Sequence, residues 1–153
     1  MRNWKKIVWY LLVGIFILIQ FYPIDKPVTT FDNPNDLLKN VEMSKNVSTL
    51  IKGACYDCHS NESIFPWYAS ISPVKWWVYD HIKEGREELN FSEWNSIKKL
   101  DKTELLDDII SALEEKEMPL KPYPLTHSKA KLSDADRQSI IDWAEIHMEE
   151  LFE

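Results

Sequence analysis

Two cysteines and a histidine lie within the five residues Cys55-Tyr56-Asp57-Cys58-His59. They are the only cysteines of the chain, so no long-range disulfide framework can be built from them. On a helical turn, two thiols three residues apart can reach the two vinyl groups of one porphyrin, and the adjacent imidazole can bind its iron. The C-x-x-C-H pattern therefore predicts one covalently attached c-type haem, held by Cys55 and Cys58, with His59 as the proximal iron ligand.

Two other uses of a closely spaced cysteine pair predict different surroundings. A thioredoxin-like pair usually begins a helix inside a βαβ unit. Here apolar residues at helical spacing over residues 44–55 place a helix before the pair, and no segment has the period of a strand. A structural zinc ion needs four ligands, and the remaining histidines, His81, His127 and His147, are scattered. We therefore expect haem rather than a redox-active pair, a zinc site or an accidental pair.

The sixth coordination position of the iron is either open or filled by a second ligand, for which Met118 is the first candidate. It lies at the expected end of a helix, directly before Pro119 and a proline-rich loop. The ordinary interpretation of a single methionine is a core residue. His81, on the same helical face as Trp77, is the alternative ligand or a donor to a haem propionate, and His127 is a third candidate. Histidine with methionine raises the reduction potential compared with two histidines.

Helices are expected to position these residues. They run from about 44 to 55, from 72 to near 85, over a short piece from 92, from 101 to about 118, and from 133 onward. N-cap signals mark three starts: Ser72 before a proline, a capping box beginning at Asp101, and Ser133 before an acidic first turn. Residues 60–71 and 119–132 are expected loops. The chain is therefore predicted to be all-α.

Large aromatic residues are expected to wall the haem and fill the core, because a small domain has limited apolar core of its own. Trp67 and Trp77 are the predicted pocket residues, together with His81. The wider set is Phe65, Trp67, Trp77, Trp94 and Trp143.

An uninterrupted apolar run covers residues 7–24, with Gln20 as its clearly polar member. Eighteen helical residues span about 27 Å, close to the hydrocarbon thickness of a bilayer. The basic tip, residues 1–6, is expected in the cytoplasm. A cleaved signal peptide is the alternative, although no A-x-A-like site follows the run. The expected order is a transmembrane anchor over 7–24, a linker over 25–43 and an exported domain over 44–153.

Charge is unevenly distributed along the chain, whose formal net charge is −7. Residues 1–25 hold three basic groups and one acidic group, whereas the remaining residues hold 15 basic and 24 acidic groups. An acidic domain is a poor match for nucleic acid, whose phosphates require Lys and Arg. It is a reasonable match for a basic protein partner, where charge mainly accelerates encounter.

The chain resembles the bacterial haem-binding domain family with a single C-x-x-C-H, over roughly residues 30–150. The matching segments are Cys55–Glu62, Pro66-Trp67-Tyr68, Ile71–Val74 with Trp77, Asp80-His81, Glu84-Gly85-Arg86, Leu89–Trp94, Glu117-Met118-Pro119, Tyr123 and Leu132-Ser133-Asp134. The resemblance implies haem attachment at Cys55 and Cys58, with His59 proximal and Met118-Pro119 in the distal loop, where a second proline is more usual than Leu120. The order of elements also resembles class I cytochromes c.

Together these features predict a single-pass protein of the bacterial inner membrane, with its haem domain in the periplasm. It is expected to exchange single electrons with redox proteins at the membrane and to be a carrier rather than a catalyst. The alternatives are a peroxidase-like or gas-binding haem protein with an open sixth position, and a haem-bearing subunit of a larger oxidoreductase.

Overall fold

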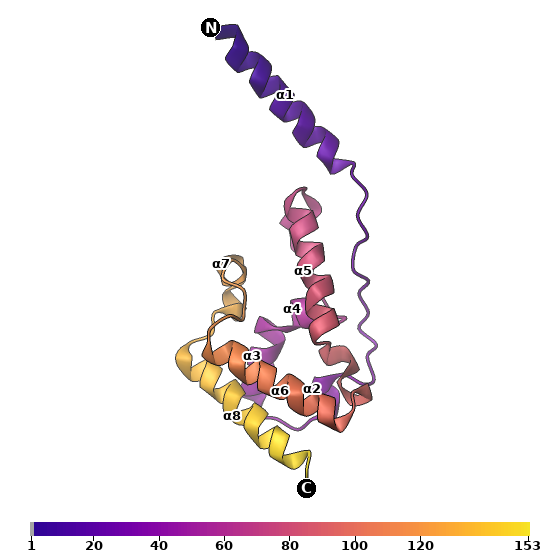
Figure 1. Ribbon diagram of the computed structural model, residues 1–153, viewed down its shortest axis with the longest axis vertical. Helices are drawn as coiled ribbons and strands as arrows, with labels where there is room; N and C mark the ends of the chain where they lie inside the picture. The colour runs from indigo at the N-terminus through magenta and orange to yellow at the C-terminus, as the bar shows by residue number, and fades with distance from the viewer. Residues whose placement is uncertain (1) are drawn as a thin grey trace.

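The computed structural model describes residues 2–153, and within that range the chain is helical with no strand. The first helix, α1 (Arg2–Gln20), stands apart from a cluster of shorter helices, to which a long extended segment connects it (Figure 1). The all-α prediction is confirmed. Asn3–Gln20 is long and apolar enough to cross a membrane.

The remaining helices form one domain. In chain order they are α2 (Leu37–Asn40), α3 (Lys45–Ala54), α4 (Tyr56–His59), the 3₁₀ helix η1 (Trp67–Ser70), α5 (Val74–Glu88), η2 (Phe91–Ser96), α6 (Lys99–Glu114), α7 (Tyr123–Thr126), η3 (Ser128–Ala130) and α8 (Asp134–Glu150).

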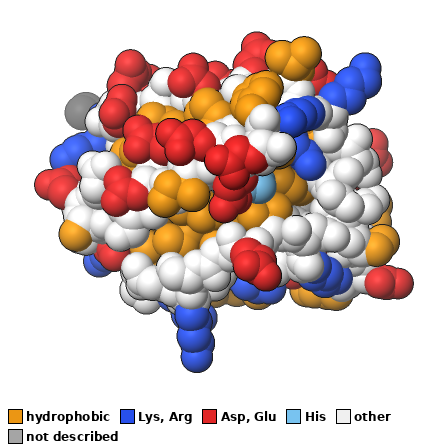
Figure 2. Space-filling model, turned by 90° about the horizontal axis from the view of Figure 1, so that it is seen from below, with side chains coloured by type: hydrophobic (Ala, Val, Ile, Leu, Met, Phe, Trp, Pro, Cys, Tyr) orange, Lys and Arg blue, Asp and Glu red, His pale blue; other side chains and the backbone are white. Residues whose placement is uncertain are grey.

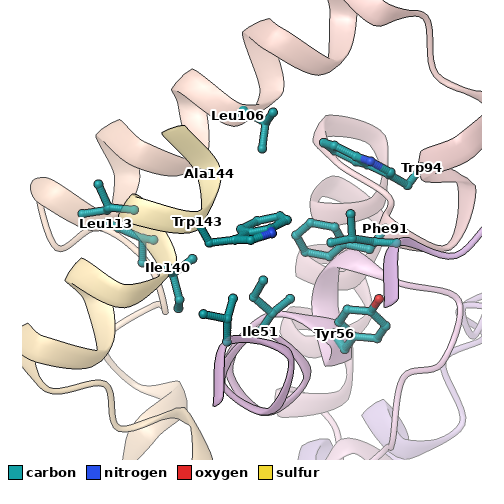
Figure 3. Packing of buried hydrophobic residues seen from close by; sticks show 12 residues of the cluster. Ile51, Tyr56, Phe91, Trp94, Leu106, Leu113, Ile140, Trp143 and Ala144 are labelled. Atoms are coloured by element: carbon teal, nitrogen blue, oxygen red, sulfur yellow. The ribbon is translucent and has the colours of Figure 1, made fainter. Parts of the chain in front are cut away.

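The core lies where α6 and α8 run side by side and α3 packs against α8 (Figure 1). Trp94, Leu106 and Ile140 are almost completely buried there. Trp143, from α8, projects between these helices, with Ile51 of α3 below it and Phe91 beside it in Figure 3. Helices that are short on their own are thus stabilised by a shared apolar interior, which is the usual source of helix stability in proteins.

Two predicted helix starts are confirmed by their caps. The hydroxyl of Ser44 accepts a hydrogen bond from the amide of Val47 at 3.2 Å, so α3 begins at Lys45. Ser133 and Asp136 form a reciprocal capping box at the start of α8. Each side chain satisfies an amide that has no partner within the helix.

Two other predicted starts are wrong in detail. Asp101 does not open a helix, because α6 already begins at Lys99; the carboxylate instead lies in the first turn, where it interacts favourably with the helix dipole. Ser72 does not cap α5, whose N-cap residue is Pro73. The backbone amide and carbonyl of Ser72 are both bonded to the side chain of Gln20 instead.

The second half of the predicted linker is part of the domain. Asp36 and Leu37 are buried, and the carboxylate of Asp36 caps α2 and accepts a hydrogen bond from the phenol of Tyr56 at 2.9 Å. Polar turn residues over this stretch suggested a tether. Their polar groups are satisfied within the fold instead.

Candidate cofactor site

A cavity of about 430 Å³ opens between α3, α4, α6 and α8. Figure 2 shows an apolar hollow on the face seen from below, with acidic side chains along its rim. Residues from both halves of the domain line the cavity: Ile51, Ala54, Cys55, His59, Glu88, Leu89, Phe91, Leu105, Asp108, Ile109, Ser111, Ala112, Leu113, Glu115, Glu117, Met118, Pro119, Ile140 and Trp143. Its size and mostly apolar lining are those of a cofactor or ligand site.

His59 has a defined tautomer in this cavity. Its Nδ1 lies 2.8 Å from the carbonyl oxygen of Gly85 and 3.2 Å from that of Leu89. Carbonyl oxygens only accept hydrogen bonds, so Nδ1 carries the proton and donates it. Burial lowers the pKa of His59, against the opposing effect of the two carbonyls, which favours the neutral ring. The lone pair of Nε2 is therefore available for a metal ion, with the other nitrogen held as metal-binding histidines usually are.

Gly85 allows α5 to approach the cysteine motif. A Cβ atom at this position would lie 3.1 Å from the carbonyl oxygen of Cys58 and 3.4 Å from its Cβ. Any larger residue would push α5 away from α4. The carbonyl of residue 85 would then move away from the Nδ1 of His59. The sequence suggested that a helix weakens at this glycine, whereas α5 continues to Glu88.

Met118 reaches the same cavity through a tight turn after α6. The amide of Glu117 donates to the carbonyl of Ala112 at 3.0 Å, and that of Lys116 to Leu113 at 3.3 Å, which is a Schellman motif with Lys116 in the left-handed conformation (φ 57°). Arg137 of α8 donates to the carbonyl oxygen of Met118. The position of this methionine is thus determined by two helices.

The following loop is bonded directly to the cysteine motif. The phenol of Tyr123 donates to one carboxylate oxygen of Asp57 at 2.6 Å, and the other oxygen accepts from the amide of Ile64 at 3.0 Å. Burial and the neighbouring carboxylate raise the pKa of Tyr123, so the phenol stays protonated. Asp57 is thereby the residue that joins the two segments bearing the predicted iron ligands.

Cys55 is the residue between α3 and α4, and Cys58 lies within α4. Cys55 lines the cavity, and Cys58 lies against α5. As free thiols they would be poor nucleophiles, because burial raises the pKa of Cys55 to about 12 and that of Cys58 to about 11. A thioredoxin-like pair requires a readily formed thiolate. Residues 2–153 also contain neither a strand nor a cluster of three potential metal-binding side chains.

Four residues expected at the pocket or as ligands lie elsewhere. Trp67 is 78% exposed, and Trp77 is 44% exposed. The ring of His81 lies against that of Trp77, with centroids 4.2 Å apart, and its Nδ1 is bonded to the carbonyl of Trp77. His127 stacks on Tyr123 in the following loop. The structure brings none of these side chains to the cavity lining, whereas His59 and Met118 share it.

The residues present fit a haem. The cavity is mostly apolar, one neutral imidazole has a free nitrogen, and a thioether lies on the same lining. The indole N–H of Trp143 is buried with no hydrogen-bond partner among the described residues, and it could serve a carboxylate of a bound group. The sequence predicted Trp143 as part of the cavity wall, but it did not reveal that the indole N–H would have no hydrogen-bond partner among the described residues.

The sequence assigned no role to several positioning residues, although Gly85 and Tyr123 lie in segments that resemble the haem-binding family. The C-x-x-C-H motif carried Asp57 as a variable position, and Tyr123, Arg137 and Gly85 gave no local sign of their role. Their contacts join residues 19 to 66 positions apart. A pairing of that kind leaves no periodic signal in one sequence.

An all-helical domain with an apolar cavity beside a C-x-x-C-H histidine belongs to the class of haem proteins. The family model described as "haem-binding domain" matches residues 14–146, and the chain belongs to that family. Neither the comparison with curated proteins nor that with solved structures found a match.

Proposed function

We propose that this protein is a membrane-tethered c-type cytochrome that carries one covalently attached haem and transfers single electrons on the periplasmic side of the inner membrane. The observation that carries the proposal is that His59, with a free Nε2, and Met118 line one cavity beside Cys55. The group would supply one-electron chemistry at its iron when bound.

Several residues of the chain would hold the haem, each in a different way. Cys55 and Cys58 would form the thioether bonds, and α3 and α4 present both thiols within one turn. His59 would bind the iron from one side. Met118 would be the second ligand, held in place by the Schellman turn and Arg137. If His59 and Met118 both bound the iron, the protein would leave no position on it for a substrate, which is why we propose a carrier rather than an enzyme.

Charge around the cavity supports a basic redox partner. Four acidic residues line it, Glu88, Asp108, Glu115 and Glu117, and among the described residues no Lys or Arg does so. Opposite charge on a partner would accelerate encounter, and the acceleration would decrease with ionic strength. The proposed tether is α1, which has the length and composition of a single membrane span.

The spectrum of the purified, haem-loaded chain tests the proposal. We expect haem that stays attached after denaturation, a low-spin ferric state and a near-infrared methionine–iron band. Met118→Ala should abolish the band. Met148→Ala, a methionine packed against the core in α8, is the matched control and should leave it intact.

Two outcomes would contradict the proposal. High-spin iron that binds CO or peroxide would indicate an enzyme or sensor with an open sixth position. Haem that is extracted by acidic organic solvent would rule out thioether attachment. Purification from native membranes with a bound oxidoreductase would instead favour the role of a haem-bearing subunit.

A further inference from the structure

The last turn of α1 is bonded to the haem domain. The side-chain amide of Gln20 donates to the carbonyl oxygen of Ser72 at 3.1 Å, and its oxygen accepts from the amide of Ser72 at 2.9 Å. Two residues later, Tyr22 packs edge-on against Trp76 of α5, with ring centroids 5.5 Å apart. The one clearly polar residue of the apolar run is therefore used to hold the start of α5.

The extended segment after α1 is also attached to the domain. The ammonium of Lys26 lies 4.2 Å from the centre of the Phe65 ring. The guanidinium of Arg86 donates to the carbonyl of Val28 at 2.7 Å, and the amide of Thr30 donates to the carbonyl of Asn61 at 2.8 Å. Contacts at three successive points hold the domain beside the end of α1, as Figure 1 shows for α5. A flexible tether that lifts the domain from the bilayer does not agree with this arrangement.

Exposed apolar side chains gather at the same end of α5. We call them the α5 apex patch, consisting of Trp67, Ile71, Val74 and Trp77, with exposed fractions of 78, 38, 43 and 44%. Ile71, Val74 and Trp77 recur at three-residue spacing, so the last two share one face of the helix. Ile71 directly precedes Ser72, the residue bonded to Gln20.

The end of α1 sets the depth of this patch. The candidate span ends at Gln20, and its 18 residues give about 27 Å of helix, close to the hydrocarbon thickness of a bilayer. Ser72, bonded to Gln20, therefore lies at the boundary between acyl chains and headgroups. Tryptophan is enriched at this boundary because its ring has an apolar body and a polar N–H.

We propose that the α5 apex patch inserts into the outer headgroup region of the bilayer and fixes the orientation of the haem domain on the membrane. This inference rests on the proposed membrane tether. It assigns a role to Trp67 and Trp77, which the cavity does not use. The patch is continuous with α1, which makes lipid its occupant rather than a second protein.

The inference places the cavity at a set distance from the lipid. The patch lies at the start of α5, whereas Glu88 and Leu89, at the other end, line the cavity. A helix of 15 residues is about 22 Å long. A docked apex would hold the cavity roughly that far from the headgroups and leave its acidic rim free for a partner.

Site-specific photo-crosslinking tests the inference in the full chain. p-Benzoylphenylalanine is placed at position 67 or 77, and the protein is reconstituted in nanodiscs of phosphatidylethanolamine and phosphatidylglycerol. Leu11, within α1, is the lipid-facing control. Leu100, an apolar residue 75% exposed at the start of α6, is the water-facing control; its neighbour Lys99 lies over Phe152 near the C-terminus, at the opposite end of the molecule (Figure 1).

We expect phospholipid adducts at positions 11, 67 and 77, and at least ten-fold less adduct at position 100. Adduct at 11 with yields at 67 and 77 equal to that at 100 would overturn the docking and leave the tether standing. Absence of adduct at 11 would overturn the tether and the docking with it. Crosslinks from 67 to a protein instead of lipid, in native membranes, would assign the patch to a protein partner and overturn the inference.

Discussion

Helix α5 contacts one histidine and carries another, and the two have opposite surroundings. At its C-terminal end, the carbonyls of Gly85 and Leu89 orient the partly buried ring of His59 in a cavity. In the middle of the helix, the ring of His81 lies against Trp77 and bonds only to the carbonyl one turn before it. The difference teaches that residue type alone does not identify a ligand. His81 also has its Nδ1 bonded to a carbonyl, so what distinguishes His59 is its place in the lining of the cavity, which it shares with Met118.

The largest expected effect separates these two histidines. His59→Ala should abolish the native low-spin haem spectrum, because the free Nε2 in the cavity is lost. His81→Ala should leave the spectrum unchanged, since this ring contacts Trp77 at the surface. Absorption spectra of both variants, with haem staining after electrophoresis, provide the measurement. If His81→Ala alone produced high-spin iron, His81 and not His59 would have to be assigned as the iron ligand.

The next prediction concerns the close approach of α5 to the motif. Gly85→Ala should decrease the free energy of unfolding by about 1–2 kcal/mol, because overpacking costs about 1–3 kcal/mol and alanine returns up to about 1 kcal/mol of helix propensity. Chemical denaturation provides the measurement. Gly14→Ala is the matched control, since its Cβ would meet no atom within 4 Å among the described residues. A variant as stable as the parent protein would show that the backbone at Cys58 shifts to accept the added methyl group at little cost in stability.

An effect of similar size is expected at the bond between the motif and the distal loop. Tyr123→Phe removes the donor to Asp57 and should decrease stability by about 1–2 kcal/mol, since hydrogen bonds to charged groups contribute about 1.5–3 kcal/mol. Tyr68→Phe is the control, because its phenol bonds to Thr126 at an exposed position. Thermal unfolding followed at the haem absorption compares the two. Equal shifts would mean that this bond does not join the two halves of the site.

The smallest effect on stability is expected at the apex. Gln20→Leu removes both hydrogen bonds to Ser72 and should reduce lipid crosslinking at position 67 several-fold. The haem spectrum and the crosslink yield at position 11 should not change, because the cavity lies at the other end of α5. An altered spectrum would show that the two ends are coupled.

Sequence reasoning was most accurate where the signal is local. The cap signal at Ser133 marked the start of α8 correctly, because a cap involves residues three positions apart, and apolar spacing placed the start of α3 near residue 44. It was less accurate at Ser72 and over residues 33–41. There a distant side chain, Gln20, and a buried carboxylate, Asp36, satisfied groups that local patterns assign to a cap or a turn.

The sequence by itself determined the all-helical fold, the length of the apolar run and a motif that places two thiols and an imidazole together, because each depends on spacing along one segment. Only the tertiary structure decided which other residues meet this motif. It brought Met118 to the cavity through the turn after α6 and kept His81 away from it. It also joined Gln20 to Ser72, which turned two tryptophans from expected pocket residues into an exposed patch beside α1. These outcomes depend on packing between distant segments, and no local pattern encodes it.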